Sequence, residues 1–452
     1  MLAPFCLALA LVAQRDSAAL VTRYRQAADK IIAAAIADSG AYRRLAELTD
    51  RFGHRFSGSE SLERAIDWVL EEMRRDGLAN VRGEPVTVPR WVRGAESAEL
   101  VSPIKRPLTM LGLGGSIATP PNGITAEVLV VSTFEELDRR GAEAKGRIVL
   151  LDAPFTTYGQ TVQYRRNSAV AAARHGAVAS LIRSITPYSM QTPHTGSMAY
   201  DSLIARIPAA AITIEDALLL RRMQDRGQKP VVKLQMAAQM LPPGTSRNVV
   251  AELVGREKPD EIVVLGGHID SWDVGTGAMD DGGGSVVTWE AVRLLSRLGL
   301  RPKRTLRVVL WTNEENGLAG ANAYRDAHQH ELDRHVLAIE SDAGVFSPRG
   351  FGFNGSDSAY RIMQWAGSLL SPIGSDSVLR GGGGADIGPL IQRGVPGAGL
   401  LVDGTRYFWY HHTEADTIDK LDPAEMARCV ATLAVMIYVV GDLDYRLPRS
   451  AG

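Results

Sequence analysis

The chain has 452 residues, of which 45% are hydrophobic, so it can bury a large core and is expected to form two domains. Its formal net charge is −1 and no long run of either sign occurs, which argues against nucleic acid or an anionic membrane as a partner. The two cysteines, Cys6 and Cys429, form neither a CxxC pair nor a zinc ribbon. Cys429 is expected to be a buried small hydrophobe.

The first residues, MLAPFCLALALVAQ, form an apolar segment that is too short to span a bilayer. The segment is similar to the hydrophobic region of a signal peptide, although no basic residue precedes it. We therefore predict a signal peptide over residues 1–17 and a secreted or periplasmic protein. A buried or frayed N-terminal helix is the alternative. If Cys6 is removed with the leader, no intramolecular disulfide can form.

The next part of the chain has helical periodicity, followed by a strand over residues 81–91. Between residues 99 and 240 prolines are frequent, and short strands alternate with helices without carboxylate clusters at their ends. We expect residues 99–240 to be a self-contained α/β domain. It would be inserted between residues 18–98 and 241–452, which together form the main domain.

The main domain continues with apolar strands and a helix, the pattern of an open α/β sheet. Strands are predicted over residues 246–253, 261–265, 304–310, 336–339 and 398–402, and a helix is predicted over residues 281–298. Ligands of such sheets bind beyond the carboxyl ends of the strands. Four of these ends carry histidines or carboxylates, and the sequence therefore predicts a metal site there.

The candidate ligands are of the residue types that zinc prefers, namely neutral imidazole and carboxylate. They are His268, Asp280, Glu315, Asp342 and His412. A bound zinc lowers the pKa of its water from about 15.7 to about 7, and two zincs about 3.5 to 4 Å apart can share a bridging carboxylate. Five ligands with one bridging carboxylate would give each of two metals three protein contacts.

Three further acids are placed to assist the predicted metals. The adjacent Glu314 and Glu315 point in different directions, so that one can bind metal while the other accepts a proton from water. Asp270, two residues after His268, is predicted to accept a hydrogen bond from that imidazole and orient it; an ordinary turn carboxylate is the alternative. Asp281 would cap the following helix or, alternatively, bind metal in place of Asp280.

Five stretches together resemble the co-catalytic zinc exopeptidases, a family that includes bacterial aminopeptidases and glutamate carboxypeptidases. They are GHRFSGSESLE, GGHIDSWDVGTGAMDDGGG, WTNEENGLAG, ESDAG and YFWYHHTEADT. The resemblance implies a mixed central sheet flanked by helices, of the phosphorylase/hydrolase-like type. It also implies that the insert is a protease-associated domain.

The resemblance also implies a role for each residue of the predicted site. His268 and Asp342 would bind one zinc, and Glu315 and His412 the other. Asp280 would bridge the two zincs, and Glu314 would be the general base. The family's second metal histidine precedes Thr or Ser, which selects His412 over His411. His411 would then be a packing or substrate-contacting residue.

The implied activity is hydrolysis of dipeptides or short peptides with free termini, by a homodimer. A broad aminopeptidase is the alternative within this chemistry, and no Arg or acid in the sequence decides between them. A deacylase of amino-acid conjugates and a non-catalytic, receptor-like binding protein are further alternatives. The glycine-rich run at residues 380–386 is either a substrate-contacting loop or a linker, and the aromatic residues 407–410 either line a pocket or pack beside it.

Overall fold

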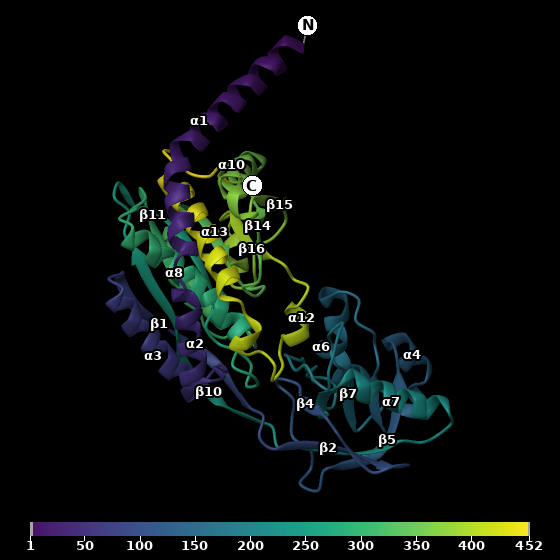
Figure 1. The fold of residues 1–452 in the computed structure, drawn as a ribbon. Helices are drawn as coiled ribbons and strands as arrows, with labels where there is room; N and C mark the ends of the chain where they lie inside the picture. The colour runs from purple at the N-terminus through teal and green to yellow at the C-terminus, as the bar shows by residue number, and fades with distance from the viewer. Residues whose placement is uncertain (1–2, 451–452) are drawn as a thin grey trace.

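The structure is a computed structural model that describes residues 3–450, with side chains described from residue 19 (Figure 1). The predicted signal peptide, residues 1–17, lies outside the residues whose side chains are described. The chain opens with three helices, α1 (Ala3–Ile36), α2 (Gly40–Phe52) and α3 (Glu60–Arg75). Ser59 caps the N-terminus of α3, because its hydroxyl accepts a hydrogen bond from the Leu62 N–H.

The central sheet has the strand order β1-β10-β12-β11-β13-β16-β14-β15. Strands β11, β12, β13 and β16 are parallel to their neighbours in this group, whereas β10 pairs antiparallel with β12, β1 with β10, and β14 with β16. The prediction of a mixed sheet is confirmed. The strands are β1 (Ala79–Val92), β10 (Gln239–Leu253), β11 (Lys258–His268), β12 (Arg304–Trp311), β13 (His335–Glu340), β14 (Pro348–Asn354), β15 (Ser377–Arg380) and β16 (Gly397–Val402).

Helices cover both faces of this sheet, because alternate side chains of each strand point to opposite faces. Val263 and Leu265 of β11 pack into the larger core, whereas Ile262 and Val264 pack into a second core on the other face. The larger core includes side chains of α1, α2, α3, α8 (Gly283–Arg297), α10 (Asp357–Gly367) and α13 (Pro423–Asp442), and the second core those of α9 (Ala319–Ala327) and α11 (Gly388–Ile391). Helix α13 is apolar and long enough to cross a membrane, but most of it is buried, as in a core helix.

A second sheet is built from residues 96–236, which we call the insert. Its order is β3-β2-β9-β5-β6-β7-β8-β4, with hydrophobic cores on both faces. Its strands are β2 (Glu96–Ser102), β3 (Arg106–Leu108), β4 (Met110–Gly112), β5 (Ile124–Val131), β6 (Ile148–Leu151), β7 (Ala179–Arg183), β8 (Ala209–Ile212) and β9 (Val231–Met236). Its helices are α4 (Phe134–Arg139), α5 (Gly141–Ala144), α6 (Tyr158–Arg174) and α7 (Ile214–Asp225).

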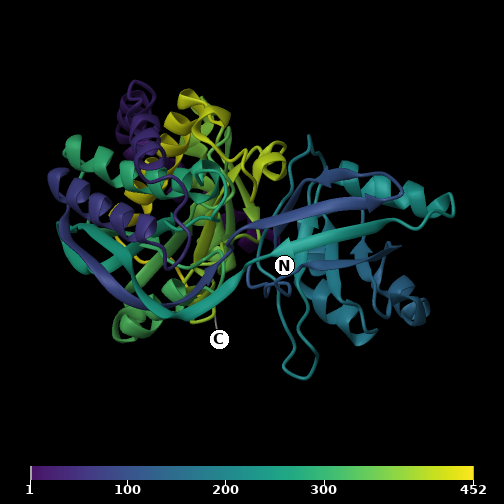
Figure 2. The same ribbon diagram turned by 90° about the horizontal axis from the view of Figure 1, so that it is seen from below.

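The insert is joined to the main sheet by the ends of β1 and β10, which run between the two units in Figure 2. A small aromatic core fills this junction, in which Phe56 packs against both Trp91 and Trp272. Arg93, just after β1, donates to Asp273 of the main domain at 2.6 Å. These contacts hold the insert against the edge of the main sheet where the predicted metal site lies.

Candidate metal centre

The predicted metal ligands come from five separate segments that meet beyond the carboxyl ends of the parallel strands. His268 is the last residue of β11, Glu315 follows β12, and Asp342 follows β13. Asp280 lies in a single turn before α8, and His412 follows the short helix α12 (Tyr407–Tyr410). The structure therefore brings together residues that are up to 144 positions apart, from 268 to 412.

Asp280 lies between the two predicted ligand pairs. Its Oδ1 is 3.2 Å from His268 Nε2, and its Oδ2 is 3.3 Å from His412 Nε2. On one side Asp342 Oδ1 is 3.5 Å from His268 Nε2, and on the other side Glu315 Oε2 is 3.0 Å from His412 Nε2. One carboxylate thus faces two imidazoles, each of which has a second carboxylate beside it.

Several buried polar atoms of this cluster have no hydrogen-bond partner among the described residues. They are His268 Nε2, Asp280 Oδ2 and Glu315 Oε1. A buried polar group without a partner is costly in a folded protein, so such atoms point to a ligand. Imidazole nitrogen and carboxylate oxygen are the donors that zinc takes, and the cluster therefore fits zinc.

Burial and the closeness of the charged groups shift the pKa values of the side chains in the cluster. Burial alone would lower the pKa of His412, but Glu315 and Asp280 outweigh it and raise that pKa to about 10. Burial and the neighbouring Asp280 raise the pKa of Glu315 to about 7. A divalent cation would relieve this repulsion among carboxylates and favour their ionised forms.

Glu314 has a different environment from the adjacent Glu315. Its Oε2 lies 4.0 Å from His268 Nε2, and its carboxylate accepts no hydrogen bond from any described residue, while its side chain is 20% exposed in the cavity. Burial, and then the nearby carboxylates of Asp342 and Glu315, raise its pKa well above the usual value. A carboxylate in this position can accept a proton.

Asp270 contacts both the imidazole of His268 and the backbone of the two glutamates, through different oxygens. His268 Nδ1 contacts the backbone carbonyl of Asp270 at 2.9 Å, whereas the Asp270 carboxylate is 3.8 Å away. That carboxylate instead accepts from the backbone N–H groups of Glu314 at 3.1 Å and Glu315 at 3.4 Å. Asp270 therefore faces the imidazole with its backbone carbonyl while its carboxylate holds the adjacent loop, and its role in orienting His268 stays a prediction.

The prediction that the helix starts at Asp281 is wrong. Helix α8 begins at Gly283, and Asp280 and Asp281 both have non-helical backbone angles. The Asp281 carboxylate accepts from the N–H of Gly284 at 3.1 Å, which is a capping contact, and from the N–H of His268 at 3.0 Å. Its oxygens are therefore occupied by backbone N–H groups, whereas Asp280 Oδ2 accepts no hydrogen bond from any described residue.

Two residues that support Asp280 were not predicted as site residues. The Asp416 carboxylate accepts from the backbone N–H groups of Met279 at 2.7 Å and Asp280 at 3.1 Å. The fully buried Arg55 donates to the backbone carbonyls of Ile269, Thr276 and Gly277, which form the loop between His268 and Asp280. Both lie inside the family-like stretches, but nothing in their spacing shows that they contact the backbone of this loop.

His411 lies beside His412 and stacks on it, with ring centroids 3.5 Å apart. Its Nε2 is 3.5 Å from Asp280 Oδ2, so that Asp280, His411 and His412 together have the spacing of a metal site. Glu315 pairs with His412 rather than His411. This pairing favours His412 as the ligand, and the assignment stays a prediction.

A cavity of about 450 Å³ opens onto the cluster. The residues that line it include Glu314, Glu315, Asp280, Asp342, His411, His412, Leu400, Tyr407 and Phe408. Among its lining residues the only lysine or arginine is Arg165, which comes from α6 of the insert. Sequence analysis missed Arg165, because its approach to the site depends on how the insert packs.

The sequence left open whether the glycine-rich run at residues 380–386 and the aromatic residues 407–410 line the cavity, and the two segments differ in this respect. The glycine-rich run does not line the cavity; a Cβ at Gly382 would lie 2.6 Å from the Gly352 backbone, and one at Gly384 would lie 2.0 Å from the Glu340 carboxylate. This run is therefore packed against β14 and Glu340, and the glycines permit the close approach. Tyr407 and Phe408 line the cavity, whereas Trp409 packs against Tyr188 of the insert.

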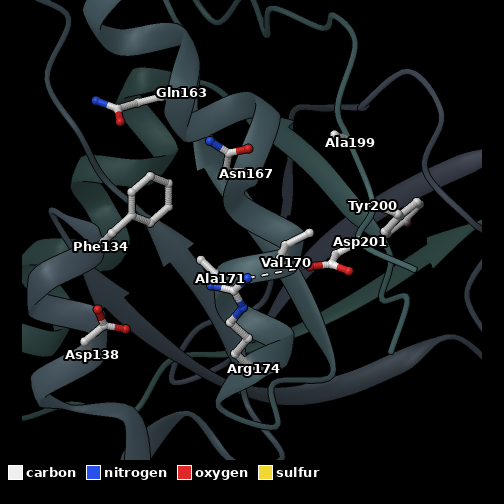
Figure 3. A pocket seen from close by; sticks show the side chains of 10 residues that line it. All are labelled: Phe134, Asp138, Gln163, Asn167, Val170, Ala171, Arg174, Ala199, Tyr200 and Asp201. Atoms are coloured by element: carbon white, nitrogen blue, oxygen red, sulfur yellow. Dashed lines mark ion pairs between the residues drawn. The ribbon is translucent and has the colours of Figure 1, made fainter. Parts of the chain in front are cut away.

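A second cavity, of about 460 Å³, lies within the insert (Figure 3). Its walls come from α4, α6 and the segment 199–201, and Arg174 pairs there with Asp201 at 3.6 Å. None of its ten lining residues is a histidine or belongs to the predicted metal cluster. The chemistry of the protein is therefore placed in the first cavity.

Comparison with known proteins agrees with this geometry. Residues 248–437, which contain all the predicted ligands, match the model of peptidase family M28. Carboxypeptidase Q of Homo sapiens is 50% identical over 414 residues, covering 92% of this chain and 88% of the human protein. The chain belongs to peptidase family M28.

Other relatives extend the match to 95% of the chain. Carboxypeptidase Q of Xenopus laevis is 49% identical over 95% of this chain and 92% of its own length. The crystal structure of a peptidase M28 precursor from Shewanella amazonensis SB2B has a TM-score of 0.91 and 37% identity, and covers 95% of this chain and 100% of that one. This M28 chain is a zinc metallo-exopeptidase.

Proposed function

We propose that this enzyme hydrolyses dipeptides or short peptides with free termini, and that Arg165 binds the C-terminal carboxylate of the substrate. The observation that carries this proposal is the position of Arg165 as the only lysine or arginine among the residues that line the cavity of the metal cluster. Similarity to carboxypeptidase Q supports the same substrate class.

The proposed cofactor is a pair of zinc ions in each chain. His268 and Asp342 would hold one zinc, Glu315 and His412 the other, and Asp280 would bridge them. The two-sided contacts of Asp280 and the unpartnered buried atoms support this arrangement. When bound, zinc lowers the pKa of water and polarises the peptide carbonyl.

The residues around the metals would carry the proton and hold the reacting groups in place. The Glu314 carboxylate accepts a proton from the attacking water and returns it to the leaving amine nitrogen. The Asp270 carboxylate accepts a hydrogen bond from the backbone N–H of Glu314, which holds the Glu314 carboxylate beside the cavity. Tyr407 and Phe408 cover one side of the cavity and reduce the access of other water.

Arg165 has donors left for a substrate carboxylate. Its Nε donates to Ser197 O at 3.3 Å, Nη1 to Thr195 O at 3.2 Å and Nη2 to Tyr158 Oη at 2.9 Å. A guanidinium has five N–H donors. Nη1 also lies 3.5 Å from His412 Nδ1, but that nitrogen carries a proton when Nε2 binds zinc and then accepts no hydrogen bond. One N–H on each of Nη1 and Nη2 is then left for the substrate. A fork of two N–H groups is the geometry that binds a carboxylate in a bidentate way. The surrounding hydrogen bonds hold the fork in one orientation.

The decisive experiment compares Arg165→Gln with the wild type on free, C-terminally amidated and N-acetylated dipeptides. Loss of charge-assisted hydrogen bonds worth about 1.5 to 3 kcal/mol should raise KM for free dipeptides about 10- to 100-fold. Amidated dipeptides should be poor substrates for the wild type and should be little affected by the substitution. Arg166→Gln is the matched control, because Arg166 is the next residue of α6 and is exposed.

Other outcomes of the same panel point to other activities. Equal turnover of amidated and free dipeptides, with no effect of Arg165→Gln, would contradict carboxylate recognition and identify a broad aminopeptidase. Preference for N-acetylated amino acids over free dipeptides would identify a deacylase. Zinc content is measured for each variant, so that loss of metal is not mistaken for loss of substrate binding.

The proposal extends to the organisation and location of the chain. The insert would be a protease-associated domain, residues 18–98 and 241–452 the catalytic domain, and the active form a homodimer. The apolar segment within residues 1–17 supports export as a secreted or periplasmic enzyme. N-terminal sequencing of the exported protein and light scattering test cleavage and dimerisation.

A further inference from the structure

One short segment of the insert, Thr195–Ser197, reaches the metal cluster and contacts both predicted ligands of a single zinc. The Thr195 N–H donates to the carbonyl of His412 at 3.1 Å, and the Thr195 carbonyl lies 3.2 Å from His412 Nδ1. The Ser197 hydroxyl donates to the carbonyl of Glu315 at 2.8 Å. The segment thus joins the two loops that carry Glu315 and His412.

The other pair of predicted ligands has no such contact. The hydrogen bonds of His268 go to Asp270, Asp281 and Ser285, which all belong to the main domain. In the part of the chain that the structure describes, no hydrogen bond joins His268 or Asp342 to the insert. The insert therefore contacts the cluster on one side only.

We infer that Thr195–Ser197 is a positioning segment through which the insert stabilises zinc at Glu315 and His412 selectively. The inference rests on the proposed pair of zinc ions. An imidazole that binds metal through Nε2 carries its proton on Nδ1, and a hydrogen-bond acceptor at Nδ1 fixes the tautomer and the orientation of the ring. The Thr195 carbonyl is that acceptor for His412, as the Asp270 carbonyl is for His268.

The segment is held firmly enough for this role. The Thr195 hydroxyl donates to the carbonyl of Gly112 at 2.7 Å and accepts from Arg93 at 3.3 Å. The Gly114 N–H donates to the carbonyl of Gly196 at 3.0 Å. Gly196 has φ of +137°, and a Cβ there would lie 2.3 Å from Arg165 Cζ. The contacts with Gly112 and Gly114 tie the segment to the end of β4, and Gly196 lets it pass close to the guanidinium of Arg165.

The contacts also connect substrate recognition with the metal. Arg165 Nη1 donates to the same Thr195 carbonyl that faces His412 Nδ1. The segment Thr195–Ser197 therefore lies between the proposed carboxylate-binding residue and one proposed zinc ligand. Displacement of this segment should change zinc affinity at Glu315 and His412 before it affects zinc at His268 and Asp342.

The test is zinc titration of the metal-stripped full chain, with Ser197→Ala as the principal variant. Loss of a hydrogen bond that positions a ligand typically lowers metal affinity 10- to 100-fold, so we expect one of two zinc-binding events to weaken by about 10-fold or more. Anomalous diffraction at limiting zinc should then locate the remaining ion at His268 and Asp342. Ser197→Thr, which keeps the hydroxyl, should restore the affinity.

Two matched controls distinguish a local effect from a general one. Ser285→Ala removes the hydroxyl that donates to the carbonyl of His268 at 2.9 Å, and should weaken the other zinc instead. Ser180→Ala removes a buried hydroxyl of the insert that has no hydrogen-bond partner among the described residues, and should weaken neither zinc. Thermal melting of each metal-stripped variant checks that it is folded.

The possible results separate this inference from the proposed function. If the wild type binds two zincs and Ser197→Ala binds both with unchanged affinity, or loses the ion at His268 and Asp342, the inference is overturned. If the wild type binds fewer than two zincs, the proposed pair of ions is wrong and the inference is overturned with it. Failure of the Arg165 experiment alone would leave the zinc titration, and hence the inference, intact.

Discussion

Glu314 and Glu315 are adjacent in the chain, yet their carboxylates have different surroundings. Glu315 pairs with His412 at 3.0 Å, whereas Glu314 faces the cavity and accepts no hydrogen bond from any described residue. Replacement of Glu314 by Gln should therefore lower kcat by about 10²- to 10⁴-fold, the usual contribution of a general base, without loss of metal. Steady-state kinetics and elemental analysis of the same preparation measure both quantities.

The matched control for this prediction is Glu315→Gln. This variant should lose zinc, because an amide is a poorer zinc ligand than a carboxylate. Retention of substantial turnover by Glu314→Gln at full zinc content would remove Glu314 from proton transfer. Loss of zinc from Glu314→Gln and not from Glu315→Gln would reverse the roles of the two residues.

The sequence predicted which residues meet at the site, but not all the contacts that hold them. His268, Glu315 and Asp342 could be predicted because parallel strands end at the same edge of a sheet. The spacing of Asp270 placed it near His268 without showing which of its oxygens faces the imidazole. Arg165 and Ser197 could not be predicted, because they reach the site only through the packing of the insert.

At the scale of secondary structure, a second buried charge network lies away from the metal cluster, between β1, β12 and α9. His328 Nε2 is 3.1 Å from Glu84, and His328 Nδ1 is 2.6 Å from Glu331, which also pairs with Arg307. Burial would lower the pKa of His328, but its hydrogen bonds with Glu331 and Glu84 outweigh burial and raise it. The network joins the edge strand β1 to the segment after α9.

This network should make stability depend on pH. Because the pKa of His328 is higher in the folded state, its contribution is fully present below its unfolded value of about 6.5 and is lost as pH rises through the folded value. His328→Gln should cost about 1 to 2 kcal/mol at pH 6, from weakened charge-assisted hydrogen bonds, and less at pH 9. Chemical denaturation of both proteins in the presence of chelator measures this difference, and an equal cost at both pH values would contradict the prediction.

Two strands that the sequence patterns missed, β14 and β15, lack the apolar run or alternation typical of a strand. The long apolar strands β11, β12, β13 and β16 were predicted because they are buried on both faces. Strand β14 has the sequence PRGFGFN, in which glycine takes alternate positions, and β15 has only four residues. Glycine is unfavourable in strands, so its presence here depends on the close approach of the glycine-rich run, which is a tertiary effect.

At the scale of the whole molecule, the metal cluster joins the ends of several core elements to the insert. Its five predicted ligands come from the end of β11, from the segments after β12, β13 and β16, and from the turn before α8, and the insert contacts two of these segments through Thr195 and Ser197. Four ionisable carboxylates lie in this cluster with little solvent, since Asp280, Glu315, Asp342 and Glu314 are all at least partly buried. Without a cation, the folded chain must hold these carboxylates against mutual repulsion or keep them protonated.

Removal of zinc should therefore lower the stability of the folded protein. The unfolded chain cannot gather ligands from residues 268 to 412, so zinc binds the folded state, and free zinc at 100 times Kd adds about 2.7 kcal/mol for each site. At about 2 to 4 °C for each kcal/mol, chelation should lower Tm by about 5 to 10 °C for each site. Differential scanning calorimetry with chelator and with excess zinc measures the shift. Glu315→Gln should show a smaller shift, because one zinc site is lost, and an unchanged Tm in the wild type would show that the cluster does not hold metal in the folded protein.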